Sequence, residues 1–237
     1  MNGRVTLKRS KYNYVISSAE RYRSFLEWRE LNNVDIIRAM VEESDASSSF
    51  VPQNARLQSV STYFPMKFDY VVGSEDNDKN KRNNYFQPAA ILYIGSFDTT
   101  GISEEIMSTQ STITLETFIN YWIYLYESIH FHLYQQSIHT GKMVFLDEVC
   151  DLSGLSIQQF SAYFVTKVMK PWLKMTQSYY PETTRRIYVM NPPSIVNLAW
   201  KLVTPLLSQG TVDKIRFEKK FNGTADEFCD SCEEILS

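Results

Sequence analysis

Glycine is scarce in this sequence, with 8 residues in 237, and the glycine-rich signature motifs are absent. Neither G-x-G-x-x-G, a Walker loop nor a G-x-S-x-G elbow occurs, which argues against the commonest dinucleotide-binding, nucleotide-hydrolysing and esterase classes. Only 3 cysteines are present; this odd number argues against a disulfide framework and fits a reducing compartment. The net charge of −3 provides no general attraction to nucleic acid. We therefore expect a cytoplasmic protein that does not bind nucleic acid.

Long uninterrupted hydrophobic runs are also absent. The most apolar long stretch, residues 118–134, contains Asn120, Glu127, His130 and His132. So many polar groups exclude this stretch as a transmembrane helix. Any association with a membrane is therefore expected to be peripheral.

Residue clusters that would support metal binding or catalysis are weak. His130 and His132 are two apart on a predicted helix, so their side chains point in nearly opposite directions. Cys229 and Cys232 form a C-x-x-C without the second pair that a zinc site needs. No nucleophile with a base and an orienting group is visible. We expect no enzymatic activity, no metal and no cofactor.

Three acidic residues, Asp147, Glu148 and Asp151, lie at the end of a predicted strand, where α/β proteins often place ligand-binding groups. Because no histidine or phosphate-binding loop accompanies them, we interpret them as turn and cap residues.

The apolar pattern predicts an α/β fold. Hydrophobic residues make up 43% and aromatic residues 14% of the chain, enough for a sizeable core. Helices are predicted over 13–31, 35–43, 114–136, 157–176 and 194–207, with a kink or break at Pro171; strands are predicted within 63–72, 90–94, 143–149, 187–190 and 211–215. This alternation predicts a mostly parallel mixed sheet of about five strands flanked by helices, after a short N-terminal helical segment. Residues 73–84 contain no apolar side chain, which predicts a flexible insertion.

The predicted helix over 194–207 is apolar around most of its circumference. Its polar residues form one narrow stripe: Ser194, Asn197, Lys201, Thr204 and Ser208. Pro205 should kink or end this helix. Protein, a bound apolar ligand or a membrane surface must cover the remaining faces.

Several motifs occur in an order and spacing that resembles the CRAL-TRIO lipid-binding domain of phosphatidylinositol transfer proteins. They are YYPE at 179–182, the strand at 187–191, the apolar helix with Trp200 and Pro205, and TVDKI at 211–215. DLSGLS at 151–156 and the segment 11–35 resemble further parts of the same family. The resemblance implies the CRAL-TRIO fold. Residues 1–44 would be a partial N-terminal helical segment, and residues 45–237 the lipid-binding domain.

The resemblance implies a function and a set of site residues. A monomeric, non-enzymatic carrier would extract a phospholipid, with phosphatidylinositol favoured, during transient contact with a membrane surface. The helix over 194–207 would be the gate of an apolar pocket. The implied headgroup ligands are Lys11, Glu182, Thr211 and Lys214, and the implied pocket and gate residues are Phe160, Phe164, Ile195, Leu198, Trp200, Leu202, Val203 and Leu206.

Departures from the family pattern leave alternatives open. Ser10 replaces the arginine of a basic pair that ends in Lys11, and Leu146 and Glu148 replace two small hydroxyl residues. A buried carboxylate would repel phosphate, which argues against phosphatidylcholine in the family's binding mode. Another hydrophobic ligand, such as a retinoid, a tocopherol or a sterol-like lipid, is an alternative. A scaffold with the same fold and no bound lipid is another.

Overall fold

A computed structural model describes residues 18–44, 50, 52–74, 84–180 and 183–218. The strands are β1 (Met66–Ser74), β2 (Asn84–Leu92), β3 (Leu146–Asp151), β4 (Thr184–Met190) and β5 (Ile215–Glu218). A helix over residues 18–31 is followed by α2 (Val34–Glu43), α3 (Ala55–Ser61), α4 (Thr99–Met107), α5 (Leu115–Thr140), α6 (Lys170–Tyr179), α7 (Val196–Val203) and α8 (Gln209–Lys214). Shorter turns are η1 (Ile94–Ser96), η2 (Ile157–Phe160), η3 (Phe164–Met169) and η4 (Thr204–Leu206).

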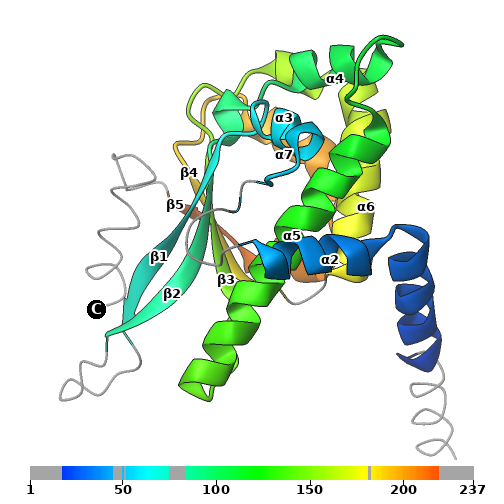
Figure 1. Ribbon diagram of the computed structural model, residues 1–237. Helices are drawn as coiled ribbons and strands as arrows, with labels where there is room; N and C mark the ends of the chain where they lie inside the picture. Colours follow the sequence, from blue (N-terminus) through cyan, green and yellow to red (C-terminus); the bar gives the residue numbers. More distant parts are fainter. Residues whose placement is uncertain (1–17, 45–49, 51, 75–83, 181–182, 219–237) are drawn as a thin grey trace, which may run out of the picture.

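The strands form one sheet in the order β1-β2-β3-β4-β5. β1 and β2 pair antiparallel, whereas β2 with β3, β3 with β4, and β4 with β5 are parallel. Helical crossovers join the parallel strands, as parallel pairing requires. Figure 1 shows α5, α6 and α7 together on one side of this sheet. The predicted fold class is confirmed.

The long helix α5 carries the largest part of the core. Its start is capped by Thr114, whose hydroxyl accepts a hydrogen bond from Thr117 N at 3.1 Å, and it ends before Gly141, which has φ of 67°. Phe118, Trp122 and Leu125 are buried on the side that faces the other helices and the sheet. α2 crosses α5 on the outside (Figure 1). None of the described helices is both long and apolar enough to cross a membrane.

The secondary structure predicted for residues 211–215 is wrong for most of the segment. The predicted strand over 211–215 begins only at Ile215, because residues 209–214 form α8. Ser208 caps α8: its hydroxyl accepts a hydrogen bond from Thr211 N at 3.2 Å. A serine cap followed by a full turn outweighs the weak strand preference of Thr211 and Val212.

Other boundaries also differ from the prediction. The helix predicted over 157–176 is divided into η2, the π-helical turn η3 and α6. The change from π-helix to α-helix lies beside Pro171, which stands in the first turn of α6, where its missing N–H is tolerated. The loop predicted over 73–84 is shorter, since Gly73 and Ser74 pair with β2. Residues 75–83 lie outside the described residues, as does the Cys229–Cys232 pair. The domain division at residue 44 stays a prediction.

Gly95 allows the turn after β2 to approach the loop after β3. A Cβ at this position would lie 1.8 Å from the carbonyl oxygen of Ser153 and 2.9 Å from Leu155 N. Both are backbone atoms that cannot rotate away. The close approach aligns the carboxyl ends of β2 and β3.

We predict that Gly95→Ala lowers the free energy of unfolding by about 2 kcal/mol or more, because the added methyl group must displace backbone. Urea denaturation measures the change. The matched control is Gly210→Ala in α8, where an added Cβ meets only Ser208 Oγ at 3.9 Å. Equal stability of the two variants would contradict the steric argument.

Candidate functional site

A cavity of about 420 Å³ separates the sheet from its covering helices. Most of its lining is apolar or aromatic. The sheet contributes Ala90, Leu92, Leu146, Glu148, Cys150, Thr184, Ile187 and Val189; the helices contribute Trp122, Leu125, Tyr126, Ile129, Phe164, Trp172, Leu173, Thr176, Val196, Ala199, Trp200, Val203, Thr211 and Lys214. A mostly apolar cavity with a few convergent polar groups is typical of a site for a small hydrophobic ligand.

The alternation of β3 divides its acidic residues between the two faces of the sheet. Leu146, Glu148 and Cys150 line the cavity, so Asp147 points to the opposite face. There Arg185 donates from Nε to Asp147 Oδ1 at 3.0 Å. The sequence suggested that Asp147 and Glu148 are turn residues. This interpretation is wrong, because β3 continues to Asp151 and both residues lie within the strand.

A β-bulge brings Thr184 to the cavity side of β4. Leu146 pairs with Thr184 and Asp147 with Arg186, so Arg185 has no residue opposite. The extra residue shifts the alternation of β4, and Thr184 before it and Ile187 after it both line the cavity. The Thr184 hydroxyl donates to Glu148 Oε1.

Burial is the main influence on the titratable groups of the cavity. It raises the pKa of Glu148; the Thr184 hydrogen bond and the charge of Lys214 oppose this rise, while Asp147 adds to it. Burial also raises the pKa values of Tyr126 and Cys150 well above their ordinary range. These two groups are therefore neutral at physiological pH, and Cys150 has no thiolate reactivity.

The structure places two of the four predicted headgroup residues at the cavity. Thr211 and Lys214 both line it from α8. Lys11 and Glu182 lie outside the described residues. The roles assigned to all four stay predictions.

The predicted pocket and gate residues fall into two groups. Phe160, Phe164, Trp200 and Val203 line the cavity, and Ile195, Leu198, Leu202 and Leu206 do not. The α-helical part of the predicted gate is α7, and Pro205 lies in the short turn η4 that follows, as expected of a helix-ending proline. Leu198 and Leu202 are 50% and 38% exposed. α7 thus presents apolar side chains both to the cavity and to the molecular surface.

Gln177 ties α6 to the segment between α7 and α8. Its Nε2 donates to Leu206 O at 2.9 Å and to Leu173 O at 3.0 Å, and its Oε1 accepts from Ser208 N. One side chain therefore satisfies backbone groups on both sides of Leu207. The sequence offered no signal for this role.

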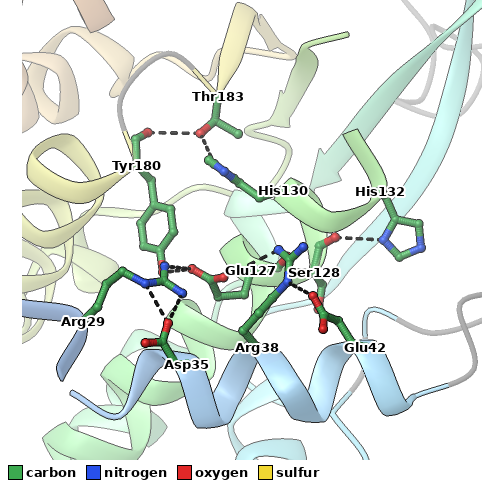
Figure 2. Close-up of polar contacts among 10 residues, drawn as sticks. All are labelled: Arg29, Asp35, Arg38, Glu42, Glu127, Ser128, His130, His132, Tyr180 and Thr183. Atoms are coloured by element: carbon green, nitrogen blue, oxygen red, sulfur yellow. Dashed lines mark hydrogen bonds and ion pairs between the residues drawn. The ribbon is translucent and has the colours of Figure 1, made fainter. Parts of the chain in front are cut away.

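Figure 2 shows a polar network that joins the N-terminal helices to α5 and to the turn before β4. At its centre is Glu127, which is 3% exposed. Glu127 Oε1 accepts from Arg29 Nη1 at 3.0 Å and from Tyr180 Oη at 2.9 Å, and Arg38 Nη1 lies 3.6 Å from Oε2. Arg29 also bonds Asp35. This network was not predicted from the sequence, although an acidic residue on the apolar face of a predicted helix signals a buried partner.

Aromatic rings reinforce the same junction. Trp28 stacks on Tyr179 with ring centroids 4.1 Å apart, and Tyr126 stacks on Tyr180 at 4.8 Å. Tyr126 and Tyr180 also line the cavity. The N-terminal helices are therefore in contact with residues that form the cavity wall.

His130 fixes the turn before β4. Its Nε2 lies 2.7 Å from Thr183 Oγ1, and the Thr183 hydroxyl donates to Tyr180 O at 3.1 Å (Figure 2). Because that hydroxyl proton is used, His130 donates its Nε2–H. Burial lowers the pKa of His130, and the charges of Arg38 and Arg29 lower it further against the opposing charge of Glu127. No cluster of three or more metal-ligating side chains occurs in the described part of the chain.

Comparison with known proteins identifies the family. A model of the CRAL/TRIO domain matches residues 77–233. The chain belongs to the CRAL/TRIO family. The SEC14 cytosolic factor of Candida glabrata is 30% identical over 158 residues, which cover 66% of this chain and 46% of that relative. A CRAL-TRIO domain-containing protein of Saccharomyces cerevisiae is 36% identical over 67 residues, or 28% of this chain and 21% of the relative.

The solved structures support the same fold. A crystal structure of Sfh5 superposes with a TM-score of 0.53 at 19% identity, covering 90% of this chain and 65% of the Sfh5 chain. These results confirm the predicted family resemblance and fold, and with them a Sec14-like, lipid-binding class of domain. The matched part of this chain spans less than half the length of each of these two curated relatives.

We predict that Glu127→Ala lowers the free energy of unfolding by about 3 kcal/mol, because it leaves the guanidinium groups of Arg29 and Arg38 without their buried counterion. Urea denaturation provides the measurement. Glu42→Ala is the control: Glu42 pairs with Arg38 on α2 but is 51% exposed, so its loss should change stability by no more than about 0.5 kcal/mol. If Glu127→Ala lowered the free energy of unfolding as little as Glu42→Ala does, the network would be dispensable for stability.

We predict that His130 makes the protein less stable as pH falls below about 6.5, the pKa of a histidine in an unfolded chain. The folded-state pKa is lower, so the unfolded state binds more protons in the intervening window and stability rises with pH there. His130→Asn should reduce the slope of unfolding free energy against pH between about pH 5 and 7. His139→Asn, at the exposed end of α5, should leave the slope in place. An unchanged slope in His130→Asn would contradict this assignment.

Proposed function

We propose that this protein is a non-enzymatic lipid carrier that extracts a phosphoinositide, most simply phosphatidylinositol, from a membrane into the cavity. The cavity itself is the observation that carries the proposal. Its volume of about 420 Å³ lies within the range of sites for small hydrophobic ligands, and its lining is mostly apolar. A bound apolar ligand would remove these side chains from contact with water.

The gate role of α7 is supported by its two apolar sides. Trp200 and Val203 line the cavity, while Leu198 and Leu202 are exposed. In contact with a membrane, the exposed side chains would enter an apolar environment. Lys201 lies beside them and is exposed, which suits interaction with the headgroup region. The same helix can therefore cover a lipid in the closed state and contact the bilayer while it opens.

The phosphate site is proposed at α8. Lys214 supplies a compact positive charge and Thr211 a hydroxyl donor, and both line the cavity. They are three residues apart on one short helix, so their side chains lie on the same side of it. Glu182, which immediately precedes Thr183 in the sequence, would accept hydrogen bonds from inositol hydroxyls.

We predict that Lys214→Ala reduces phosphatidylinositol transfer between liposomes by about 10- to 100-fold, the effect of losing one hydrogen bond to a charged group. Unfolding by urea should be little changed. Lys174→Ala, at an exposed position of α6, is the control for the loss of one positive charge away from the cavity. Unchanged transfer in Lys214→Ala would remove the proposed phosphate site.

Mass spectrometry of lipid bound after incubation with mixed liposomes tests the ligand class independently. Bound phosphatidylinositol is the expected result. A neutral isoprenoid or sterol would retain the carrier and reject the phosphate site. Absence of any bound lipid would favour a scaffold.

A further inference from the structure

Two charged residues occur among the described residues that line the cavity, Glu148 and Lys214. Glu148 lies on the sheet, in the middle of β3, and Lys214 in the last turn of α8. They come from different elements and line the same cavity. One negative and one positive group therefore share a cavity whose other walls are mostly apolar.

The Glu148 carboxyl has few groups to stabilise its charge. Among the described residues, its hydrogen-bond partner is the Thr184 hydroxyl, on Oε1. Lys214 is the cation that favours its ionised form, and Asp147, adjacent on β3, disfavours it. Burial opposes ionisation of Glu148, and the hydrogen bond from Thr184 and then the charge of Lys214 favour it.

The other titratable residues of the cavity do not compete for protons near neutral pH. Tyr126 on α5, Cys150 on β3 and Tyr180 complete the set, and burial raises the pKa of each. On the opposite face of the sheet, Asp147 is paired with Arg185. Burial lowers the pKa of His130, whose ring contacts Thr183 and Tyr180 rather than Glu148.

We propose that Glu148 takes up a proton when an anionic lipid headgroup binds Lys214, so that the affinity of the cavity for that lipid falls as pH rises. The inference rests on the phosphate role of Lys214 proposed above. A phosphate at Lys214 cancels the field that stabilises the carboxylate and adds a negative charge of its own. In a poorly solvated space, two anions that share one cation repel strongly, and protonation of Glu148 removes the repulsion.

Protonation also preserves the hydrogen bonds of the site. The neutral carboxyl still accepts from Thr184 on Oε1. Its new O–H can donate to an oxygen atom of the ligand, such as a phosphate or ester oxygen. The residue that opposes an anionic lipid when ionised thus becomes a donor to it when neutral.

The sign of the pH dependence follows from linkage. Below the pKa of Glu148 in the free protein, the proton is already present and affinity is constant. Between this pKa and the higher pKa in the complex, binding takes up one proton, and affinity falls by up to about tenfold per pH unit. Reciprocally, the bound lipid raises the proton affinity of Glu148 by the same factor.

The test uses dioctanoyl phosphatidylinositol, a short-chain probe, with the full chain. Binding can be followed by tryptophan fluorescence, because Trp122, Trp172 and Trp200 line the cavity. Titrations at several pH values from about 5.5 to 8.5 compare wild type, Glu148→Gln and Asp213→Asn. The glutamine variant keeps the shape of the side chain without its charge. Asp213 precedes Lys214 in sequence but is exposed, so its variant controls for general electrostatic effects.

We expect the affinity of wild type and Asp213→Asn to fall with rising pH, and that of Glu148→Gln to stay high and nearly constant. Calorimetry of wild type in two buffers of different ionisation enthalpy should detect net proton uptake. Parallel pH profiles for wild type and Glu148→Gln, or no proton uptake at any pH, would overturn the inference. If either of these results were obtained while Lys214→Ala still abolished binding, the proposed phosphate site would stand. Absence of binding by wild type at every pH would overturn both.

Discussion

The space between the sheet and its covering helices is the constraint on which the other features of this structure depend. Protein interiors are normally close-packed, so walls that face a cavity must be held apart by contacts outside it. Here the supports are the aromatic stacks at Trp28–Tyr179 and Tyr126–Tyr180, the carboxylate of Glu127 between two arginines, and the bonds of Gln177 to the α7–α8 segment. These polar and aromatic contacts keep the cavity walls in place without filling the cavity.

The N-terminal helices are part of this support. Arg29 lies in the helix over 18–31 and Arg38 in α2, yet both reach Glu127 on α5. Through Tyr180, the same carboxylate contacts the turn that enters β4. The N-terminal helices, α5 and the residues before β4 are therefore joined by one buried charge. Removing that charge would weaken the cavity wall as well as the helical junction.

Sequence patterns were sufficient for the sheet and the long helix, because these depend on hydrophobic periodicity over many residues. The strands at 187–190 and 143–149 and the face of α5 follow directly from that pattern. The helical structure of residues 211–214 could not be predicted in the same way, because it depends on a single serine cap at position 208. The π-helical turn η3 before Pro171 has no sequence signature.

The candidate site could likewise be predicted only in part. Family resemblance led to Thr211 and Lys214, which do face the cavity. The orientation of Glu148 depended on the exact length of β3, and that of Thr184 on a bulge of one residue. Strand boundaries and bulges are set by pairing between distant segments, so residue order alone could not assign these side chains to the cavity.

The position of Gln177 has a mechanical consequence for any opening of the cavity. Its bonds to Leu206 and Ser208 hold the segment between α7 and α8, the helix that carries Lys214. A motion of α7 that preserves them must pivot near residues 204–208 and leave α8 in place. The apolar cover would then move while the cationic rim remains stationary. In such a motion, a charged headgroup could stay anchored at one fixed point while the acyl chains enter or leave, so the order of contacts during exchange would be set by the hinge.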